Sequence, residues 1–241
     1  MNIDIAITAS EASPEKTMHR NVAVIDVFRA TSVMITALKY GAKRIIPVTT
    51  VEEALCQKKI FTEKGEQVLL GGERNAVLIK GFDKDNSPLA YTGKDIKGRT
   101  IVMTTTNGTR AVNNSRHARN IYIAALLNAD AVCEKISQDG NDILLVCSGR
   151  ENNYTLEDAL CAGMMTDYLL RNCRTITLSD IAWSLRDIYL LYKDDFRKGL
   201  ANSRHYNNIL KLGLDKDVTY CLQRNITDIV PYADKQFNIV L

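Results

Sequence analysis

The chain has 241 residues, of which 46% are hydrophobic and 24% are charged, and its net charge is +3. These values are typical of a soluble globular protein with one large domain or two small ones. The small charge and the lack of any Lys- or Arg-rich run argue against nucleic-acid binding. No apolar run approaches the roughly 18 residues that span a bilayer, and the N-terminus lacks a signal-peptide pattern. We therefore expect a cytoplasmic protein without membrane partners.

The cysteine pattern agrees with that location. None of the cysteines form C-x-x-C pairs, and most lie within apolar runs; they are Cys56, Cys133, Cys147, Cys161, Cys173 and Cys221. We expect reduced, mostly buried thiols and no structural zinc site.

The first two-thirds of the chain alternates between strand and helix patterns. The predicted elements, in chain order, are strands Ile3–Thr8 and Val22–Val27, helix Ala30–Tyr40, strand Arg44–Val48, helix Thr50–Lys64 and strand Gln67–Leu70. Residues 75–97 follow and are predicted to be irregular, because glycine and proline occur along this segment. Next come strand Thr100–Met103, helix Thr109–Ser115, strand Asn120–Ala124, helix Ala129–Gln138, strand Asp142–Val146 and helix Leu156–Arg171. This alternation predicts βαβ units and a mostly parallel sheet with helices on both faces.

The last third is mostly helical. It predicts helices Ser179–Lys193, Asp194–Gly213 and Asp215–Arg224, followed by short strands at Ile229–Pro231 and Phe237–Leu241. The fold class is therefore α/β, a three-layer arrangement with a mostly parallel sheet sandwiched by helices and a helix-rich C-terminal subdomain. We place the α/β core at residues 1–175 and the subdomain at 176–241, with one single domain as the alternative.

Four predicted strands lead directly into reactive polar residues. They are followed by Asp26 and Arg29, by Gly72-Glu73-Arg74, by Thr104–Arg110 and by Ser148-Gly149-Arg150. In open α/β sheets, ligands bind beyond the carboxyl ends of the strands. The sequence therefore predicts one site at which these residues bind an anion together with a cation.

Asp26 interrupts an otherwise apolar strand. A buried carboxylate costs several kcal/mol unless a partner or a metal compensates its charge. The side chain is expected to cap the helix that begins near Ala30, to pair with Arg29, to ligate a metal or to act as a nucleophile. The sequence leaves these four roles open.

Two further segments have a composition that suits anion binding. Gly71–Arg74 sets a carboxylate and a guanidinium beside two glycines, either as an anion-binding loop or as a plain turn with a surface ion pair. Thr104–Arg110 combines hydroxyl groups, Asn-Gly and a predicted helix start, either as a phosphate cradle or as a simple helix cap. The P-loop pattern GxxxxGK[ST] is absent.

Acidic residues from separate segments supply a candidate metal set. Mg²⁺ prefers one or two carboxylates together with waters and phosphate oxygens. Asp26, Glu73 and Asp158 form such a set if their segments meet, although Asp158 in the first turn of its helix also complements the helix dipole. The segment Asp83–Asn86 either ligates a hard cation or forms Asx-turns.

The histidines show no metal-binding spacing. Of the three, only His205 is a candidate for the site, and its alternative role is that of a surface or cap residue. Glu157, beside Asp158, either complements the helix dipole or faces the site.

Taken in order, these segments resemble the 2-phosphosulfolactate phosphatase (ComB-like) family. The matching strings are Ile25–Ser32, Gly72–Arg74, Gly81–Asp83, Asn86–Pro88, Thr104–Arg110, Cys147–Gly149 and Thr155–Asp158 with Ala162-Gly163. A weaker match continues through Ser203–His205, Leu210, Gly213, Asp217-Val218 and Val230-Pro231. The resemblance covers nearly the whole chain. Departures from the family pattern are Asp85, where the family has glycine, Phe28, where it often has leucine, the polar run Arg150–Asn153, and Tyr206, where a small residue is expected.

The resemblance implies an α/β fold and Mg²⁺-dependent hydrolysis of (2R)-2-phospho-3-sulfolactate to 3-sulfolactate and phosphate, a step of coenzyme M biosynthesis. The implied catalytic residues are Asp26, Arg29, Glu73 and Asp158, with the metal on Asp26, Glu73 and Asp158. The implied substrate-binding residues are Arg74, Thr105, Thr106, Asn107, Gly108, Thr109, Arg110, Ser148, Arg150 and His205. Metal and arginines together would offset the charge of a substrate that carries phosphate, carboxylate and sulfonate.

Other functions remain open at this point. One is a non-catalytic module that binds a small phosphorylated or sulfonated acid, and another is a phosphatase for a related phosphorylated hydroxy acid. A purely structural protein would leave Asp26 and the polar strand ends unexplained. Whether Asp26 is a nucleophile or a metal ligand is undecided, although metal-activated water is the favoured interpretation because the DxDx[TV] signature is missing. The sequence does not determine the oligomeric state, although enzymes of this size often form dimers, which makes a homodimer one candidate.

Overall fold

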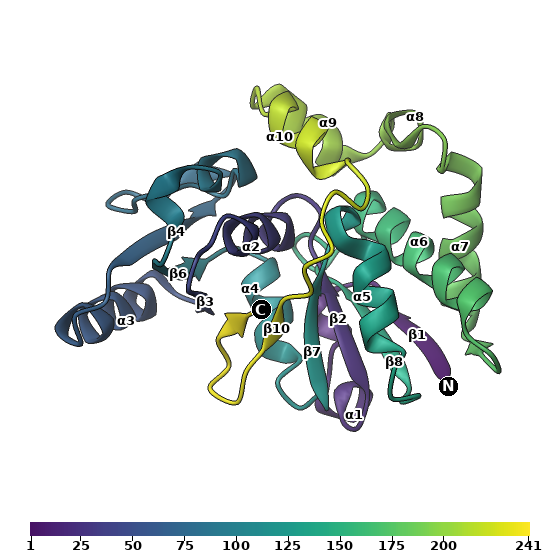
Figure 1. The fold of residues 1–241 in the computed structure, drawn as a ribbon. Helices are drawn as coiled ribbons and strands as arrows, with labels where there is room; N and C mark the ends of the chain where they lie inside the picture. Colours follow the sequence, from purple (N-terminus) through teal and green to yellow (C-terminus); the bar gives the residue numbers. More distant parts are fainter.

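The computed structural model describes residues 1–241 and contains one eleven-stranded mixed sheet (Figure 1). In sheet order, the strands are β5 (Val77–Leu78), β4 (Val68–Arg74), β6 (Thr100–Thr104), β3 (Arg44–Pro47), β11 (Ile239–Val240), β10 (Tyr232–Ala233), β7 (Asn120–Ala124), β2 (Asn21–Ile25), β8 (Ile143–Cys147), β1 (Asn2–Ala6) and β9 (Thr177–Leu178). Most neighbouring pairs are parallel, which confirms the predicted fold class.

A C-terminal hairpin divides the sheet into two parallel groups. Strands β9, β1, β8, β2 and β7 form one group, and β3, β6 and β4 form the other. Between them, β10 pairs antiparallel with β7 through Tyr232 and Tyr122, and β11 pairs antiparallel with β3 through Ile239 and Ile45. Since β10 and β11 are also antiparallel, the two groups run in opposite senses along the sheet. The sequence did not predict this interruption.

Helices cover both faces of the sheet, as predicted. The α-helices are α1 (Pro14–Thr17), α2 (Ala30–Lys39), α3 (Val51–Glu63), α4 (Gly108–Asn114), α5 (Ala129–Ile136), α6 (Leu156–Asn172), α7 (Asp180–Tyr192), α8 (Phe196–Leu200), α9 (Arg204–Lys211) and α10 (Asp215–Cys221). Short 3-10 helices are η1 (Ala9–Glu11), η2 (Pro88–Tyr91), η3 (Lys94–Ile96) and η4 (Leu126–Asn128). None of the helices combines the length and the hydropathy that crossing a bilayer requires.

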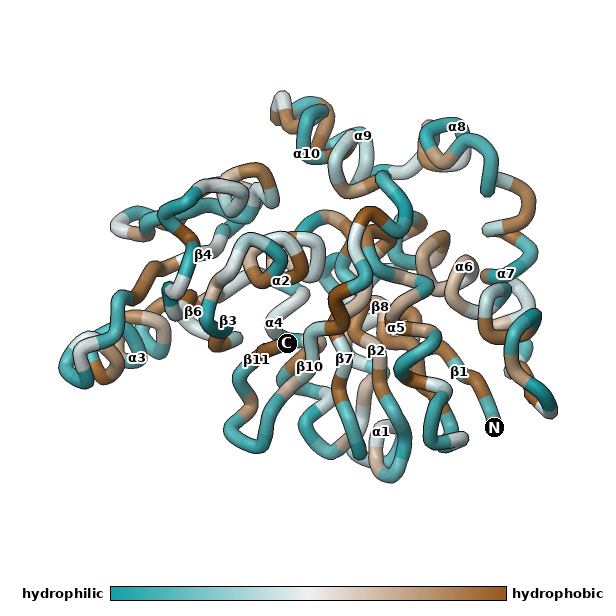
Figure 2. The backbone as a smooth tube through the Cα atoms, viewed as in Figure 1, coloured by the Kyte–Doolittle hydropathy of each residue, from teal (hydrophilic) through white to brown (hydrophobic).

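The central strands are buried on both faces, and alternate side chains enter different cores. In β2, Ala23 and Ile25 pack in a core with residues of α5, α6 and α7, whereas Val22 and Val24 pack in a second core with residues of α2 and α4. Successive side chains of a strand point to opposite faces, so an unbroken apolar run is what such a strand requires. Figure 2 shows the resulting hydrophobic colouring along β2 and β7. A smaller third core lies between α3 and strands β3, β4 and β6.

Residues of the C-terminal helices share the first core with the sheet. Leu185 of α7, Leu200 of α8, Ile209 of α9 and Val218 of α10 belong to the same hydrophobic cluster as Ile3 of β1. The predicted boundary between residues 175 and 176 remains a prediction. All six cysteines are free thiols, and Cys56 is exposed.

Some predicted elements were wrong at their boundaries. The single helix predicted over Asp194–Gly213 is two helices, α8 and α9, because Ser203 caps α9 by accepting a hydrogen bond from Tyr206 N at 3.3 Å. The strand predicted to end at Leu70 continues through Arg74, since Gly72 pairs with Thr104 of β6. The C-terminal strand predicted at 229–231 lies at Tyr232–Ala233 instead.

Candidate active site

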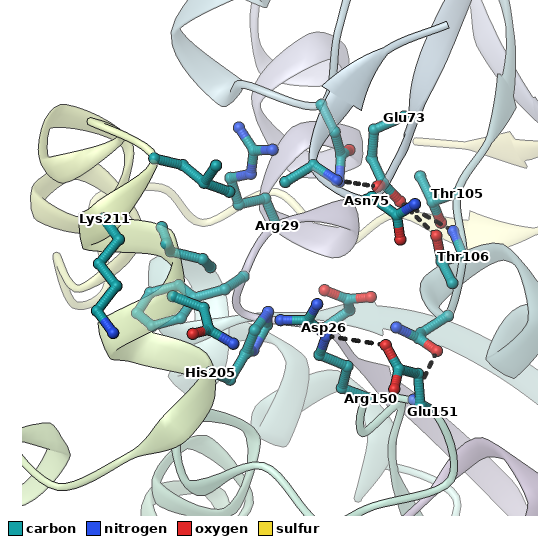
Figure 3. A pocket seen from close by; sticks show the side chains of 17 residues that line it. Asp26, Arg29, Glu73, Asn75, Thr105, Thr106, Arg150, Glu151, His205 and Lys211 are labelled. Atoms are coloured by element: carbon teal, nitrogen blue, oxygen red, sulfur yellow. Dashed lines mark hydrogen bonds and ion pairs between the residues drawn. The ribbon is translucent and has the colours of Figure 1, made fainter.

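The polar strand ends meet at one cavity of about 320 Å³, which residues of α9 also line (Figure 3). The predicted site residues that line it are Asp26, Arg29, Glu73, Thr105, Thr106, Asn107, Arg150 and His205. Those that do not line it are Arg74, Gly108, Thr109, Arg110, Ser148 and Asp158. The two parallel groups of strands therefore contribute to a single site even though they run in opposite senses.

Asp26 follows β2 directly and is 7% exposed. Its Oδ1 accepts a hydrogen bond from Ala30 N at 3.1 Å, so the predicted cap contact with α2 is present. The predicted partner Arg29 pairs elsewhere. Burial raises the pKa of Asp26 to about 6, against the lowering effects of the Ala30 N–H, the Ser148 hydroxyl and the charge of His205. Asp26 is thus a carboxylate with one oxygen held by the helix.

Glu73 joins the end of β4 to the loop after β6. Its Oε1 accepts hydrogen bonds from both N and Oγ1 of Thr106, each at 3.0 Å, and its Oε2 accepts one from Ala76 N at 2.7 Å. These donors fix the carboxylate at the wall of the cavity. Asp26 and Glu73 are two buried carboxylates on one cavity, one from each group of strands.

Fewer residues of the predicted phosphate cradle, Thr104–Arg110, line the cavity than expected. Thr105 Oγ1 accepts from Thr109 N at 3.1 Å, and Thr109 Oγ1 donates to Thr105 O at 3.0 Å. These bonds satisfy the Thr109 N–H at the start of α4, whereas the N-cap residue Asn107 makes no side-chain cap hydrogen bond. Only Thr105, Thr106 and Asn107 of this segment face the cavity.

Gly108 is required by close packing against Asp26. A Cβ atom placed on Gly108 would lie 2.6 Å from Asp26 Oδ2 and would also clash with Ala30 Cβ. The glycine therefore lets the start of α4 approach Asp26 without lining the cavity itself.

Arg29 is held by a buried aspartate from the C-terminal helices. Its Nη1 donates to Asp217 Oδ2 at 2.6 Å, and Asp217 Oδ1 accepts from Ser87 Oγ at 2.6 Å. Both charged side chains are almost fully buried. Asp217 thus fixes the guanidinium at the cavity wall, a role that the sequence did not reveal because the pair is 188 residues apart.

The other arginines divide into two classes. Arg150 lines the cavity and lies 3.5 Å from Glu151 Oε1. Arg74 instead donates to Glu73 O and Thr104 Oγ1, and Arg110 is exposed on α4. Lys211 of α9, which the sequence analysis did not single out, is a further cation on the cavity.

Asp158 lies behind the cavity wall with its oxygens engaged by the protein. Oδ1 accepts from Val27 N at 2.9 Å, and Oδ2 accepts from Thr155 Oγ1, Gly149 N and Ser148 Oγ. Burial and the neighbouring charge of Glu157 raise the pKa of Asp158 well above its ordinary value. Asp158 and Ser148 therefore brace the loops after β2 and β8.

The predicted three-carboxylate metal set is not assembled. No group of three or more Asp, Glu, His or Cys side chains is arranged to hold a metal ion. Asp26 and Glu73 nevertheless both line the cavity, and two carboxylates completed by waters and phosphate oxygens suit Mg²⁺. The segment Asp83–Asn86 forms a turn, in which Asp85 Oδ1 accepts from Ser87 N at 3.0 Å.

His205 reaches the cavity from α9. Its Nδ1 is hydrogen-bonded to Glu157 Oε1, and its ring packs edge-on against Phe28 with centroids 6.3 Å apart. The ordered Ser203-Arg204-His205 string was the only sequence signal for this placement. Asn86 and Asn208 also line the cavity and were not predicted as substrate-binding residues.

Comparison with known proteins identifies the family. The family model described as 2-phosphosulpholactate phosphatase matches residues 7–236. A protein of Clostridium novyi named "Probable 2-phosphosulfolactate phosphatase" is 43% identical over 231 residues, which cover 96% of each chain. Proteins with the same name from Clostridium acetobutylicum and Clostridium botulinum (strain Eklund 17B) are each 41% identical, over 96% and 97% of this chain and 97% of their own. This chain belongs to the 2-phosphosulfolactate phosphatase family of phosphoric monoester hydrolases.

Proposed function

We propose that this protein hydrolyses (2R)-2-phospho-3-sulfolactate to 3-sulfolactate and phosphate in a Mg²⁺-dependent reaction. The observation that carries the proposal is a cavity that holds two buried carboxylates, Asp26 and Glu73, among the cations Arg29, Arg150 and Lys211. The names of the relatives supply the substrate. The expected roles in coenzyme M biosynthesis and in the cytoplasm remain predictions.

The charges of the cavity suit a substrate with three anionic groups. Phosphate, carboxylate and sulfonate each need a cationic or hydrogen-bonding partner once water is excluded. Arg29, fixed by Asp217, and the polar groups of Thr105 and Asn107 suit the phosphate, because all three line the cavity together with Asp26. Arg150 and Lys211 are then left for the carboxylate and the sulfonate.

Two carboxylates beside a phosphate require a compensating cation. Asp26 and Glu73 would otherwise repel the substrate, and together they present the hard oxygen ligands that Mg²⁺ prefers. These two residues would hold the ion, which would neutralise charge on the phosphoryl oxygens. Glu73 is well suited because the Thr106 and Ala76 donors already fix its orientation.

Asp26 would act through the ion that it holds, which would activate an attacking water. Its pKa of about 6 belongs to the metal-free protein, and a bound cation would favour the ionised carboxylate. Direct attack of Asp26 on phosphorus is the alternative. Quenching the reaction during turnover and treating the protein with hydroxylamine distinguishes them, because only direct attack leaves an acyl phosphate on Asp26.

The function is tested by phosphate release from a panel of small phosphorylated acids that includes phosphosulfolactate and phospholactate. We expect release from phosphosulfolactate with Mg²⁺ and none with EDTA. Release from phospholactate alone would replace the substrate but keep the reaction. Binding of these acids without any phosphate release would favour the binding module instead.

A further inference from the structure

A buried glutamate holds the histidine that faces the cavity. Glu157, the second residue of α6, is 1% exposed, and its Oε1 is hydrogen-bonded to His205 Nδ1. An imidazole has two nitrogens, so a ring that donates Nδ1–H to a carboxylate offers Nε2 to its other neighbours. Because His205 lines the cavity with Asp26, that nitrogen is the one available to a bound ligand.

The second oxygen of Glu157 shows that this pair is costly to the fold. Oε2 is buried without any hydrogen-bond partner. A buried polar atom left unpaired costs about 1–3 kcal/mol, and an apolar pair at such a place is often at least as stable as an ionic one. A stabilising role therefore explains the pair poorly, and a role for His205 in the cavity explains it better.

Aromatic packing fixes the ring relative to the loop that carries Asp26. Phe28 packs edge-on against His205 and stacks on Tyr206, with centroids 6.3 and 6.4 Å apart. Phe28 lies two residues after Asp26, and all of these side chains are buried or nearly so. His205 of α9 and the loop that carries Asp26 are consequently held together by one aromatic cluster.

The proposed reaction needs a proton donor that has not yet been assigned. The alcohol of a phosphorylated 2-hydroxy acid leaves as a strongly basic alkoxide, and protonation by a positioned side chain speeds such a step by about 10²–10⁴-fold. Among the acids on the cavity, both oxygens of Glu73 already accept hydrogen bonds, and Glu151 is exposed. Asp26 is needed on the side of the attacking water. His205 remains.

We propose that His205 donates the proton to the departing alcohol oxygen and that Glu157 is its positioning residue. The proposal rests on the phosphatase function proposed above. His205 acts in its imidazolium form, with Nδ1–H donated to Glu157 and a second proton on Nε2. Water forms the new P–O bond and loses a proton to solvent, the ester P–O bond breaks, and the electron pair on the leaving oxygen takes the Nε2 proton of His205. Solvent then returns a proton to Nε2, so that the ester and one water become alcohol and phosphate.

The test compares two substrates that differ in one atom. The first is 2-phospholactate or phosphosulfolactate, whichever the wild-type protein cleaves faster, and the second is its analogue with sulfur in place of the bridging oxygen. A thiolate leaves without a proton, so only the oxygen ester needs His205. We expect His205→Ala to lower kcat on the oxygen ester by about 100-fold or more and on the sulfur analogue by less than about tenfold. Added imidazole should restore part of the lost rate.

If Glu157 positions His205, its replacement should also lower kcat more on the oxygen ester than on the sulfur analogue, by a smaller factor than His205→Ala does. Glu157→Gln keeps the shape but weakens the hold on Nδ1, so kcat on the oxygen ester should fall about tenfold or more while KM changes little. The matched control is His117→Ala, which alters an exposed histidine that does not line the cavity. It should behave as wild type on both substrates.

Two results would overturn the inference without touching the proposed function. One is an equal loss on the oxygen and sulfur esters in His205→Ala, which would make the histidine a binding residue. The other is a Glu157→Gln variant with unchanged kcat. A wild-type protein that releases no phosphate from either oxygen ester would instead contradict the phosphatase function itself.

Discussion

Arg29 Nη1 donates to Asp217 Oδ2 at 2.6 Å, and this buried pair ties the loop after β2 to α10 across 188 residues of sequence. It is the contact through which the C-terminal helices fix a cation of the cavity. The helix-rich C-terminal part of the chain is thereby a component of the site and not merely a cover for it.

Removing the aspartate of this pair is expected to destabilise the folded protein strongly. Asp217→Ala leaves the Arg29 guanidinium buried without its partner, and breaking a buried ion pair in this way costs about 3–5 kcal/mol of folding free energy. Denaturant unfolding measures the loss. Asp215 lies on the same helix as Asp217 and makes an exposed ion pair with Arg197 of α8. Asp215→Ala should cost at most about 1 kcal/mol. Equal losses in the two variants would contradict the role of the pair.

The structure separates arginines that the sequence treated alike. Arg150 lines the cavity and Arg110 does not, so we expect Arg150→Ala to raise KM by about 10- to 100-fold, the equivalent of one charge-assisted hydrogen bond. Arg110→Ala should leave both kcat and KM within about twofold of wild type. Steady-state kinetics on phosphosulfolactate decide the point, and a large effect at Arg110 would mean that the cavity is not where the substrate binds.

Gly108 should tolerate no larger residue. The added methyl group of Gly108→Ala meets Asp26 Oδ2 at 2.6 Å and Ala30 Cβ, so α4 must move away from Asp26. Overpacking of this kind costs about 1–3 kcal/mol, and we expect activity to fall by more than the stability loss alone explains. Thermal unfolding and kcat are measured together. An active variant of unchanged stability would show that the close approach is unimportant.

Ionisation of Asp26 is expected to lower the free energy of unfolding of the metal-free protein. Its pKa is about 6 in the folded protein, above the ordinary value of 3.8, so the folded state binds the proton more tightly than the unfolded state. The penalty is absent at low pH and grows as the pH rises through about 6. Asp26→Asn should therefore raise the free energy of unfolding of the metal-free protein by about 1–3 kcal/mol at pH 8 and by much less near pH 4.

Metal addition supplies the matching control for that variant. Mg²⁺ should raise the melting temperature of the wild-type protein, because binding to the folded state alone stabilises it, and should raise that of Asp26→Asn much less. A variant that is destabilised at pH 8 would contradict the raised pKa of Asp26. An equal response to Mg²⁺ in both proteins would remove Asp26 from the metal site.

The sequence predicted the parallel strands and the cavity residues that follow them, because both depend on local signals. The apolar runs of β2 and β8 alternate between two cores, and the polar residues at their ends are placed by the strands themselves. The strand predicted at Phe237–Leu241 contains β11, but its pairing with β10 as a hairpin could not be predicted, since each strand has two residues. The insertion of this hairpin reverses one group of strands relative to the other.

The residues that the sequence missed act through distant partners. Asp217 meets Arg29 and Glu157 meets His205 only because α9 and α10 fold back over the strand ends. Asp158 was predicted to face the metal because it follows Ser148 at a helix start, but the Val27 and Gly149 amides, with the Ser148 and Thr155 hydroxyls, occupy its oxygens. The sequence pattern predicts that Asp158 lies at the start of a helix. The hydrogen-bond donors around it, which come from other segments, determine whether its carboxylate can bind a ligand.

The central claim is that Asp26, at the end of β2, is the carboxylate on which hydrolysis depends. The measurement is phosphate release from phosphosulfolactate with saturating Mg²⁺ by wild-type protein and by folded Asp26→Asn. We predict clear release by the wild type and a loss of about 100-fold or more in the variant. Retention of more than about a tenth of kcat, a change of less than about 1.4 kcal/mol in the barrier, would contradict the claim.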